Sequence, residues 1–86
     1  MKFRTKEIML AFLDCLEESG GYALPEPTLR AMLDARLRPA VGDAEYDDAK
    51  LALKQKDAIA TVPDEFDPDL VKLTIKERGK AMLAAN

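Results

Sequence analysis

The sequence predicts one small, mostly helical domain of the α+β class. Three stretches in the first two thirds of the chain repeat apolar residues at helical spacing, and two short stretches after them are rich in β-branched residues. The 86 residues hold 48% apolar and 34% charged side chains, which is the balance of a folded globular chain with a modest core. We therefore expect residues 1–86 to form a single domain.

A first helix is expected over residues 5–18, where apolar side chains recur along one face. Thr5 is the residue expected to cap its first turn, and Gly20 and Gly21 are expected to end it, because glycine accepts the left-handed conformation that follows many helices. Cys15 lies within the apolar stripe. We interpret it as a small core residue and not as a nucleophile.

A short extended piece at residues 22–24 and a second helix over residues 26–38 are expected next. Two prolines open this helix, in a turn where the missing N–H is not needed. Leu29 and Leu33 belong to its buried stripe, and Pro39 is expected to stop it.

A third helix is expected over residues 43–57. Asp43 is the expected cap, and further carboxylates crowd the favourable end of the helix dipole. Tyr46 and Leu53 lie on the face that should be buried, whereas Leu51 points away from it.

The apolar pattern then changes period, which predicts a β-hairpin followed by a last helix. Residues 58–62 and 70–75 are the expected strands, and the connecting residues 63–69 contain two prolines and no periodic apolar pattern. A two-stranded ribbon is not stable alone, so it must lie against the helices. The final helix is expected over residues 77–85.

Two stretches give the chain a resemblance to winged helix-turn-helix domains. Residues 52–61, "ALKQKDAIAT", are similar to the family's end of the third helix, and residues 71–83, "VKLTIKERGKAML", are similar to the strand that leaves the wing and enters a last helix. The resemblance covers residues 5–85. It implies a three-helix core, a two-stranded β-hairpin wing and a C-terminal helix. Asp57 stands where the family often has glycine, so we expect a wider turn there, and Lys76 replaces a usual capping threonine.

The resemblance also implies a transcription regulator that binds DNA, with the third helix in the major groove and the wing on the backbone. DNA affinity comes largely from Lys and Arg at phosphates. The candidate contacts with DNA are Lys50, Lys54, Lys56 and Arg30. A single such domain offers few contacts, so a homodimer is plausible.

The charge distribution argues against DNA and for a protein partner. Residues 43–69 carry three basic and nine acidic side chains, although this segment contains the part of the third helix and the wing that should meet phosphates. The acids that we assign to a protein-binding surface are Asp47 and Asp48 on the helix and Asp64 and Glu65 on the wing. Helix-dipole complementation and loop solubility are the ordinary explanations for such acids.

Leu51 and Phe66 are the apolar candidates for the same surface. Leu51 is on the outward side of the third helix, and Phe66 is the aromatic residue of the wing tip. Either side chain can fold back on the core. If both are exposed, they form an apolar patch with an acidic rim, which is typical of a protein-binding site that attracts a basic partner.

The composition leaves little room for catalysis. One cysteine and no histidine exclude the common catalytic triads and the usual zinc sites. The acidic wing lacks the glycine and closing glutamate of a calcium loop, and no glycine-rich phosphate loop is present. We expect no metal, no cofactor and no enzyme activity.

The expected environment is the cytoplasm. The longest apolar run covers residues 8–13, far short of the roughly 20 residues that span a bilayer, and the start of the chain lacks a signal-peptide pattern. Two functions remain open: a DNA-binding transcriptional regulator, and a protein–protein interaction adaptor that uses the acidic third helix and wing.

Overall fold

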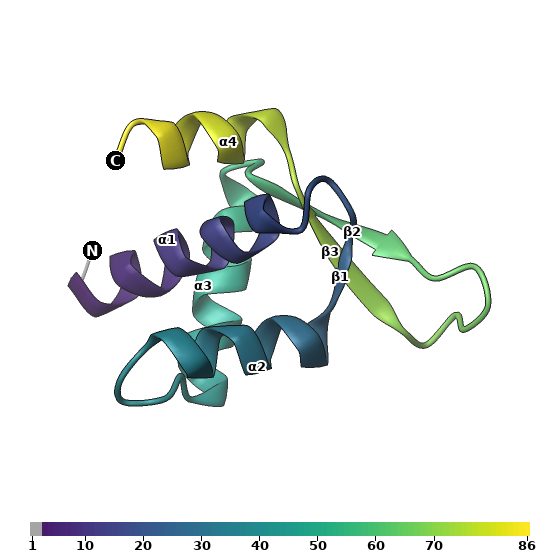
Figure 1. Ribbon diagram of the computed structural model, residues 1–86, viewed down its shortest axis with the longest axis horizontal. Coiled ribbons are helices and arrows are strands. Elements are labelled where there is room, and N and C mark those ends of the chain that lie inside the picture. Colours follow the sequence, from purple (N-terminus) through teal and green to yellow (C-terminus); the bar gives the residue numbers. More distant parts are fainter. Residues whose placement is uncertain (1–2) are drawn as a thin grey trace.

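Figure 1 shows a computed structural model of the protein, in which residues 3–86 are described. Within that range the chain forms four helices and a three-stranded antiparallel sheet. The elements follow one another as α1 (Phe3–Glu18), β1 (Leu24–Pro25), α2 (Glu26–Arg36), α3 (Asp43–Gln55), β2 (Ile59–Pro63), β3 (Val71–Ile75) and α4 (Glu77–Ala84). The predicted α+β class with a majority of helix is confirmed.

The sheet has the strand order β1-β3-β2, with β3 in the centre. The predicted hairpin is formed by β2 and β3, with Ile59 opposite Ile75. The expectation of two strands is wrong, because Leu24 of β1 pairs with Leu73 on the other side of β3. This third strand is only two residues long, so it has no alternation from which a strand could be predicted.

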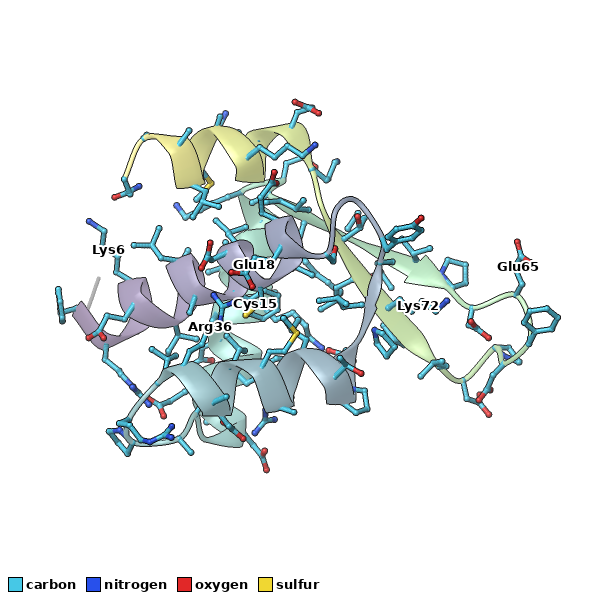
Figure 2. All side chains as sticks on the ribbon, in the orientation of Figure 1. Lys6, Cys15, Glu18, Arg36, Glu65 and Lys72 are labelled. Atoms are coloured by element: carbon cyan, nitrogen blue, oxygen red, sulfur yellow. The ribbon has the colours of Figure 1, made fainter. Side chains whose placement is uncertain are left out.

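One continuous core joins the helices to one face of the sheet. Its fully buried side chains come from α1, α2, α3 and β3, and the largest are Phe12, Ile8, Leu13, Leu16, Leu29, Leu33, Leu53 and Leu73. Burying a side chain of this size stabilises the fold by about 1.5–3 kcal/mol. Cys15 belongs to this core, as predicted, and Figure 2 shows it between α1 and α2.

The helix starts differ from the predicted ones. Helix α1 begins at Phe3, so Thr5 lies inside it and does not cap it. Asp43 is the first residue of α3 and not its cap, because Gly42 occupies that position and the Glu45 carboxylate accepts a hydrogen bond from the Gly42 N–H at 3.1 Å. A glutamate three residues into the helix can thus serve a cap that has no side chain of its own.

Two helices end earlier than predicted. Helix α2 ends at Arg36 and α3 at Gln55, each two residues earlier than expected. After α3 the Ala58 N–H donates to the Leu53 carbonyl and the Asp57 N–H donates to the Lys54 carbonyl, at 2.9 and 3.0 Å. This is a Schellman motif, with Asp57 in the left-handed position at φ 61°. The wider turn expected at Asp57 is therefore wrong.

The hairpin projects beyond the helices along the longest axis of the molecule (Figure 1). Its outer loop, residues 64–70, is called the hairpin tip below. Figure 2 places Glu65 on this tip, far from the helices. The tip is therefore open to a partner on several sides.

Candidate functional site

Asp64 fixes the conformation of the hairpin tip. One oxygen of its carboxylate accepts hydrogen bonds from the Phe66 and Asp67 N–H groups, at 3.0 and 2.8 Å. Its other oxygen lies 2.8 Å from the Lys72 ammonium on β3. The ammonium and the two N–H donors all favour the charged carboxylate, so the pKa of Asp64 is lowered. The loop is thus tied to the strand at its base.

This arrangement presents Phe66 to solvent. The side chain is 93% exposed, more than any other large apolar side chain in residues 3–86. Glu65, Asp67 and Asp69, which are near it along the chain, are also exposed. An aromatic ring in water is unfavourable unless something covers it, and these acids would attract a basic surface.

A groove lies where the hairpin returns toward the helices. It has a volume of about 550 Å³ and is open to solvent. Its walls come from the first turns of α2, one face of α3, and the segment where the hairpin tip enters β3. The lining residues are Glu26, Pro27, Arg30, Asp43, Tyr46, Asp47, Lys50, Asp69, Leu70 and Val71.

Tyr46 organises the charged floor of this groove. Its ring stacks on Phe12 of the core with the centroids 5.5 Å apart, and its hydroxyl donates to the Glu26 carboxylate at 2.8 Å. The Lys50 ammonium donates to the same Glu26 oxygen at 2.8 Å. The Arg30 guanidinium lies over the Tyr46 ring at 4.7 Å and the Lys50 ammonium at 5.5 Å. Both cations are therefore held by contacts within the chain.

The ionisation of the floor follows from these contacts. Burial alone would raise the pKa of Glu26, but hydrogen bonds from Lys50 and Tyr46 outweigh it and the pKa is lowered. Burial, together with the hydrogen bond to Glu26, raises the pKa of the Tyr46 hydroxyl. At neutral pH the floor thus holds a charged carboxylate and a neutral phenol.

The four predicted DNA contacts fall into two groups. Lys50 is paired with Glu26, and Arg30 is paired with Asp43 at 3.1 Å while also donating to the Val41 carbonyl. Lys54 and Lys56 are exposed and have no ion pair within residues 3–86. Two of the four candidate cations are thus already neutralised inside the protein.

The acids predicted for protein binding are divided in the same way. Asp64 is tied to Lys72 and supports the tip. Asp47, Asp48 and Glu65 are exposed and unpaired within the described part of the chain, and of these Asp47 lines the groove. Glu45 at the start of α3 is paired instead with Arg4 of α1, so the acids of α3 do not all face one side.

Leu51 and Phe66 are both exposed, Leu51 by 56%. They do not form one apolar patch, because Leu51 lies in the middle of α3 while Phe66 lies at the tip of the projecting hairpin (Figure 1). Of the two, Phe66 is the one with exposed acids beside it along the chain.

The groove is not predicted by the sequence pattern. Asp43, Tyr46, Asp47 and Lys50 follow the spacing i, i+3, i+4 and i+7, so their common face on α3 could have been found. The contribution of α2 and β3 to the groove could not have been found in this way. It depends on the pairing of β1 with β3, which no local sequence pattern predicts.

Two further observations concern membranes and metal ions. Within residues 3–86, no helix has the length and apolar character needed to cross a bilayer. The same residues contain no group of three or more Cys, Asp or Glu side chains that could hold a metal ion.

Comparison with known proteins finds no match of the chain to a family model, to a curated protein or to a solved structure. The ground for assigning a function is therefore the geometry of the residues themselves.

Proposed function

We propose that this protein is a non-catalytic domain of the winged helix type that acts as an adaptor and binds a protein partner through its hairpin tip. The observation that carries the proposal is Phe66, a 93% exposed aromatic side chain on a loop whose conformation Asp64 fixes. Loops that present a fixed aromatic anchor are suited to recognition, because little side-chain and loop entropy is lost on binding.

The winged helix assignment is supported by the order and placement of the elements. Helix α3 runs directly into the hairpin, a short strand before α2 joins the sheet, and a last helix follows the hairpin. In such a domain the third helix and the wing are the parts that would contact a partner.

The proposed contact places Phe66 in an apolar pocket of the partner. Glu65, Asp67 and Asp69 would then lie at the rim of the interface and face Lys or Arg side chains. Rim charges of this kind mainly steer association and set its salt dependence, whereas the buried ring supplies most of the affinity.

The test is affinity capture from a cell extract with the protein and with Phe66→Ala, read by quantitative mass spectrometry. A partner that depends on the tip should be depleted at least about tenfold in the variant, since removal of an aromatic anchor costs about 2 kcal/mol or more. Tyr22→Ala is the matched control, because Tyr22 is 79% exposed and precedes β1, outside the hairpin tip. It should leave capture unchanged. Equal yields from both variants would contradict the proposal.

The captured partner can also be a second copy of the chain. Analytical ultracentrifugation distinguishes this case, because self-association through the tip would be lost in Phe66→Ala and kept in Tyr22→Ala.

DNA binding is the second candidate function, and one observation favours it. Lys54 and Lys56 are exposed at the end of α3 without an ion pair in the described part of the chain. A fluorescence titration with random duplex DNA in about 50 mM salt decides between the two functions, because nonspecific contacts with phosphate register under such conditions. We expect no binding at micromolar protein. Binding that weakens in Lys54→Gln combined with Lys56→Gln would favour the regulator.

A further inference from the structure

The groove between α2, α3 and the start of β3 is a second recognition feature, and it differs from the tip in being concave. Its volume of about 550 Å³ exceeds what one side chain needs and is within the range of ligand sites in proteins. Pro27, Leu70 and Val71 give it an apolar wall. Such a wall can pack against the aliphatic stem of a long side chain.

The charges of the groove are not balanced. Both cations that line it form ion pairs within the chain, Lys50 with Glu26 and Arg30 with Asp43. Two carboxylates remain without an ion pair in residues 3–86: Asp47 on α3, and Asp69 in the hairpin tip, two residues before β3. An anionic ligand would meet these carboxylates and find no free cation, whereas a cationic ligand would be attracted to them.

We propose that this groove binds an arginine side chain of an extended basic segment in the protein partner. The identity of that partner as the one that covers Phe66 rests on the proposed function; the binding of arginine by the groove does not. The stem of the arginine would pack on Leu70 and Val71, and its guanidinium would pair with Asp47 and Asp69.

Arginine fits these residues better than lysine does. A guanidinium is planar and has five N–H donors, so it can serve carboxylates that come from two different elements, while an ammonium is a compact point charge. The guanidinium is also less strongly hydrated, which lowers the cost of placing it against an apolar wall.

The groove and the tip are joined along the chain. The segment from Phe66 to Val71 runs from the exposed ring to the groove wall, and it carries Asp67 and Asp69 on the way. A partner that covers Phe66 with an apolar pocket can therefore extend along the segment from Phe66 to Val71 and place an arginine in the groove. This geometry predicts a partner whose basic residues adjoin its apolar pocket.

The test is an NMR titration of the ¹⁵N-labelled protein with the capped tripeptide acetyl-Gly-Arg-Gly-amide in low salt. Saturable shifts should be confined to the amides around Asp47 and from Asp69 to Val71. Asp47→Asn and Asp69→Asn should each weaken binding about threefold, and together about tenfold, as expected for partly exposed ion pairs. The peptide with lysine should bind more weakly, and the peptide with norleucine should not bind.

The matched controls are Asp48→Asn and Glu65→Gln. Asp48 adjoins Asp47 and carries the same charge, but it does not line the groove, and Glu65 is the equivalent acid on the tip. Both variants should bind the arginine peptide with unchanged affinity. Shifts scattered over the surface, equal weakening by Asp47→Asn and Asp48→Asn, or equal binding of the norleucine peptide would overturn the proposal.

The two proposals can fail separately. Phe66→Ala should leave binding of the tripeptide unchanged, because the tripeptide offers no pocket for the ring. If capture of a partner depends on Phe66 but the arginine peptide does not bind, the groove proposal alone is overturned. If the peptide binds as expected but no capture depends on Phe66, the proposed function alone is overturned.

Discussion

At some positions the residue type is explained only by contacts between segments that are distant in the sequence. Gly79 in the first turns of α4 is the clearest case. A Cβ built there would lie 2.8 Å from Ile75 Cγ1 and 3.1 Å from Leu13 Cδ2, and would also collide with the Ala58 carbonyl oxygen. The absence of a side chain at Gly79 thus lets α4 approach both the sheet and α1.

We therefore expect Gly79→Ala to lower the free energy of unfolding by about 2 kcal/mol, measured by urea denaturation. The sign is opposite to the gain of about 1 kcal/mol that alanine gives over glycine inside a helix, because overpacking outweighs propensity here. Gly42→Ala is the control, since its Cβ would meet only a Glu45 oxygen at 3.6 Å. Because Gly42 is the N-cap of α3, where alanine is less favourable than glycine, this variant should cost only about 0.5–1 kcal/mol. A neutral or stabilising Gly79→Ala would contradict the expected close packing.

Two residues that depart from the winged helix pattern that the sequence resembles form an ion pair with each other. Asp57 follows α3 and Lys76 precedes α4, and their side chains form an ion pair. Both unusual residues are visible in the sequence, but their ion pair is not, because the pairing of β2 with β3 brings Asp57 and Lys76 together. An exposed pair of this kind contributes at most about 1 kcal/mol, so its effect is on local geometry more than on stability.

Among the elements, the hairpin tip is held by ionised side chains: Asp64 is its main anchor, and the Asp67 carboxylate accepts a further hydrogen bond from the Asp69 N–H at 3.0 Å. Asp64 accepts from two backbone N–H groups and pairs with Lys72, which lowers its pKa below the ordinary value of 3.8. A group with a lowered pKa in the folded state contributes stability above its unfolded pKa and loses it as the pH falls through its folded pKa. The tip should thus be fully ordered at neutral pH and loosen below pH 3.8.

The measurement is the pH dependence of the Phe66 and Asp67 amide shifts. We expect a transition with a midpoint below 3.8, and we expect Lys72→Met to move that midpoint upward, because the ammonium no longer favours the carboxylate. Asp64→Asn should remove the transition, since its amide oxygen can accept without titrating. A midpoint that Lys72→Met leaves in place would show that the ion pair does not control the tip.

The elements differ in how far the sequence could predict them. The four helices were found to within a few residues, because an apolar stripe at helical spacing is a local signal that burial then satisfies. The predicted caps are wrong at Thr5, which lies within the first turn of α1, and at Asp43, which stands beside the cap position that Gly42 occupies. β1 was missed as a strand because its pairing with β3 is non-local. The groove depends on that pairing and was missed with it.

At the scale of the whole molecule, one core connects every layer, and Leu73 lies at its centre. It is fully buried on the middle strand, opposite Leu24 of β1 and Thr61 of β2. A cavity at this position would remove contacts from the sheet and from the helices that cover it.

Leu73→Ala should therefore destabilise the whole domain by about 3 kcal/mol and lower the melting temperature by roughly 10–20 °C, measured by calorimetry. Leu51→Ala is the matched control, because the same atoms are removed from a side chain that is 56% exposed. It should cost less than about 0.5 kcal/mol. If the two variants lost similar free energies of unfolding, the expected difference between the buried Leu73 and the exposed Leu51 would be contradicted.

The buried thiol of Cys15 has a practical use. The chain has one cysteine, its side chain is 0% exposed, and burial raises its pKa, so almost none of it is thiolate at neutral pH. A cysteine introduced at Glu65 would stand at the outer end of the hairpin and react with a maleimide dye while Cys15 stays untouched. Fluorescence from that dye would report when a binding protein closes over the loop.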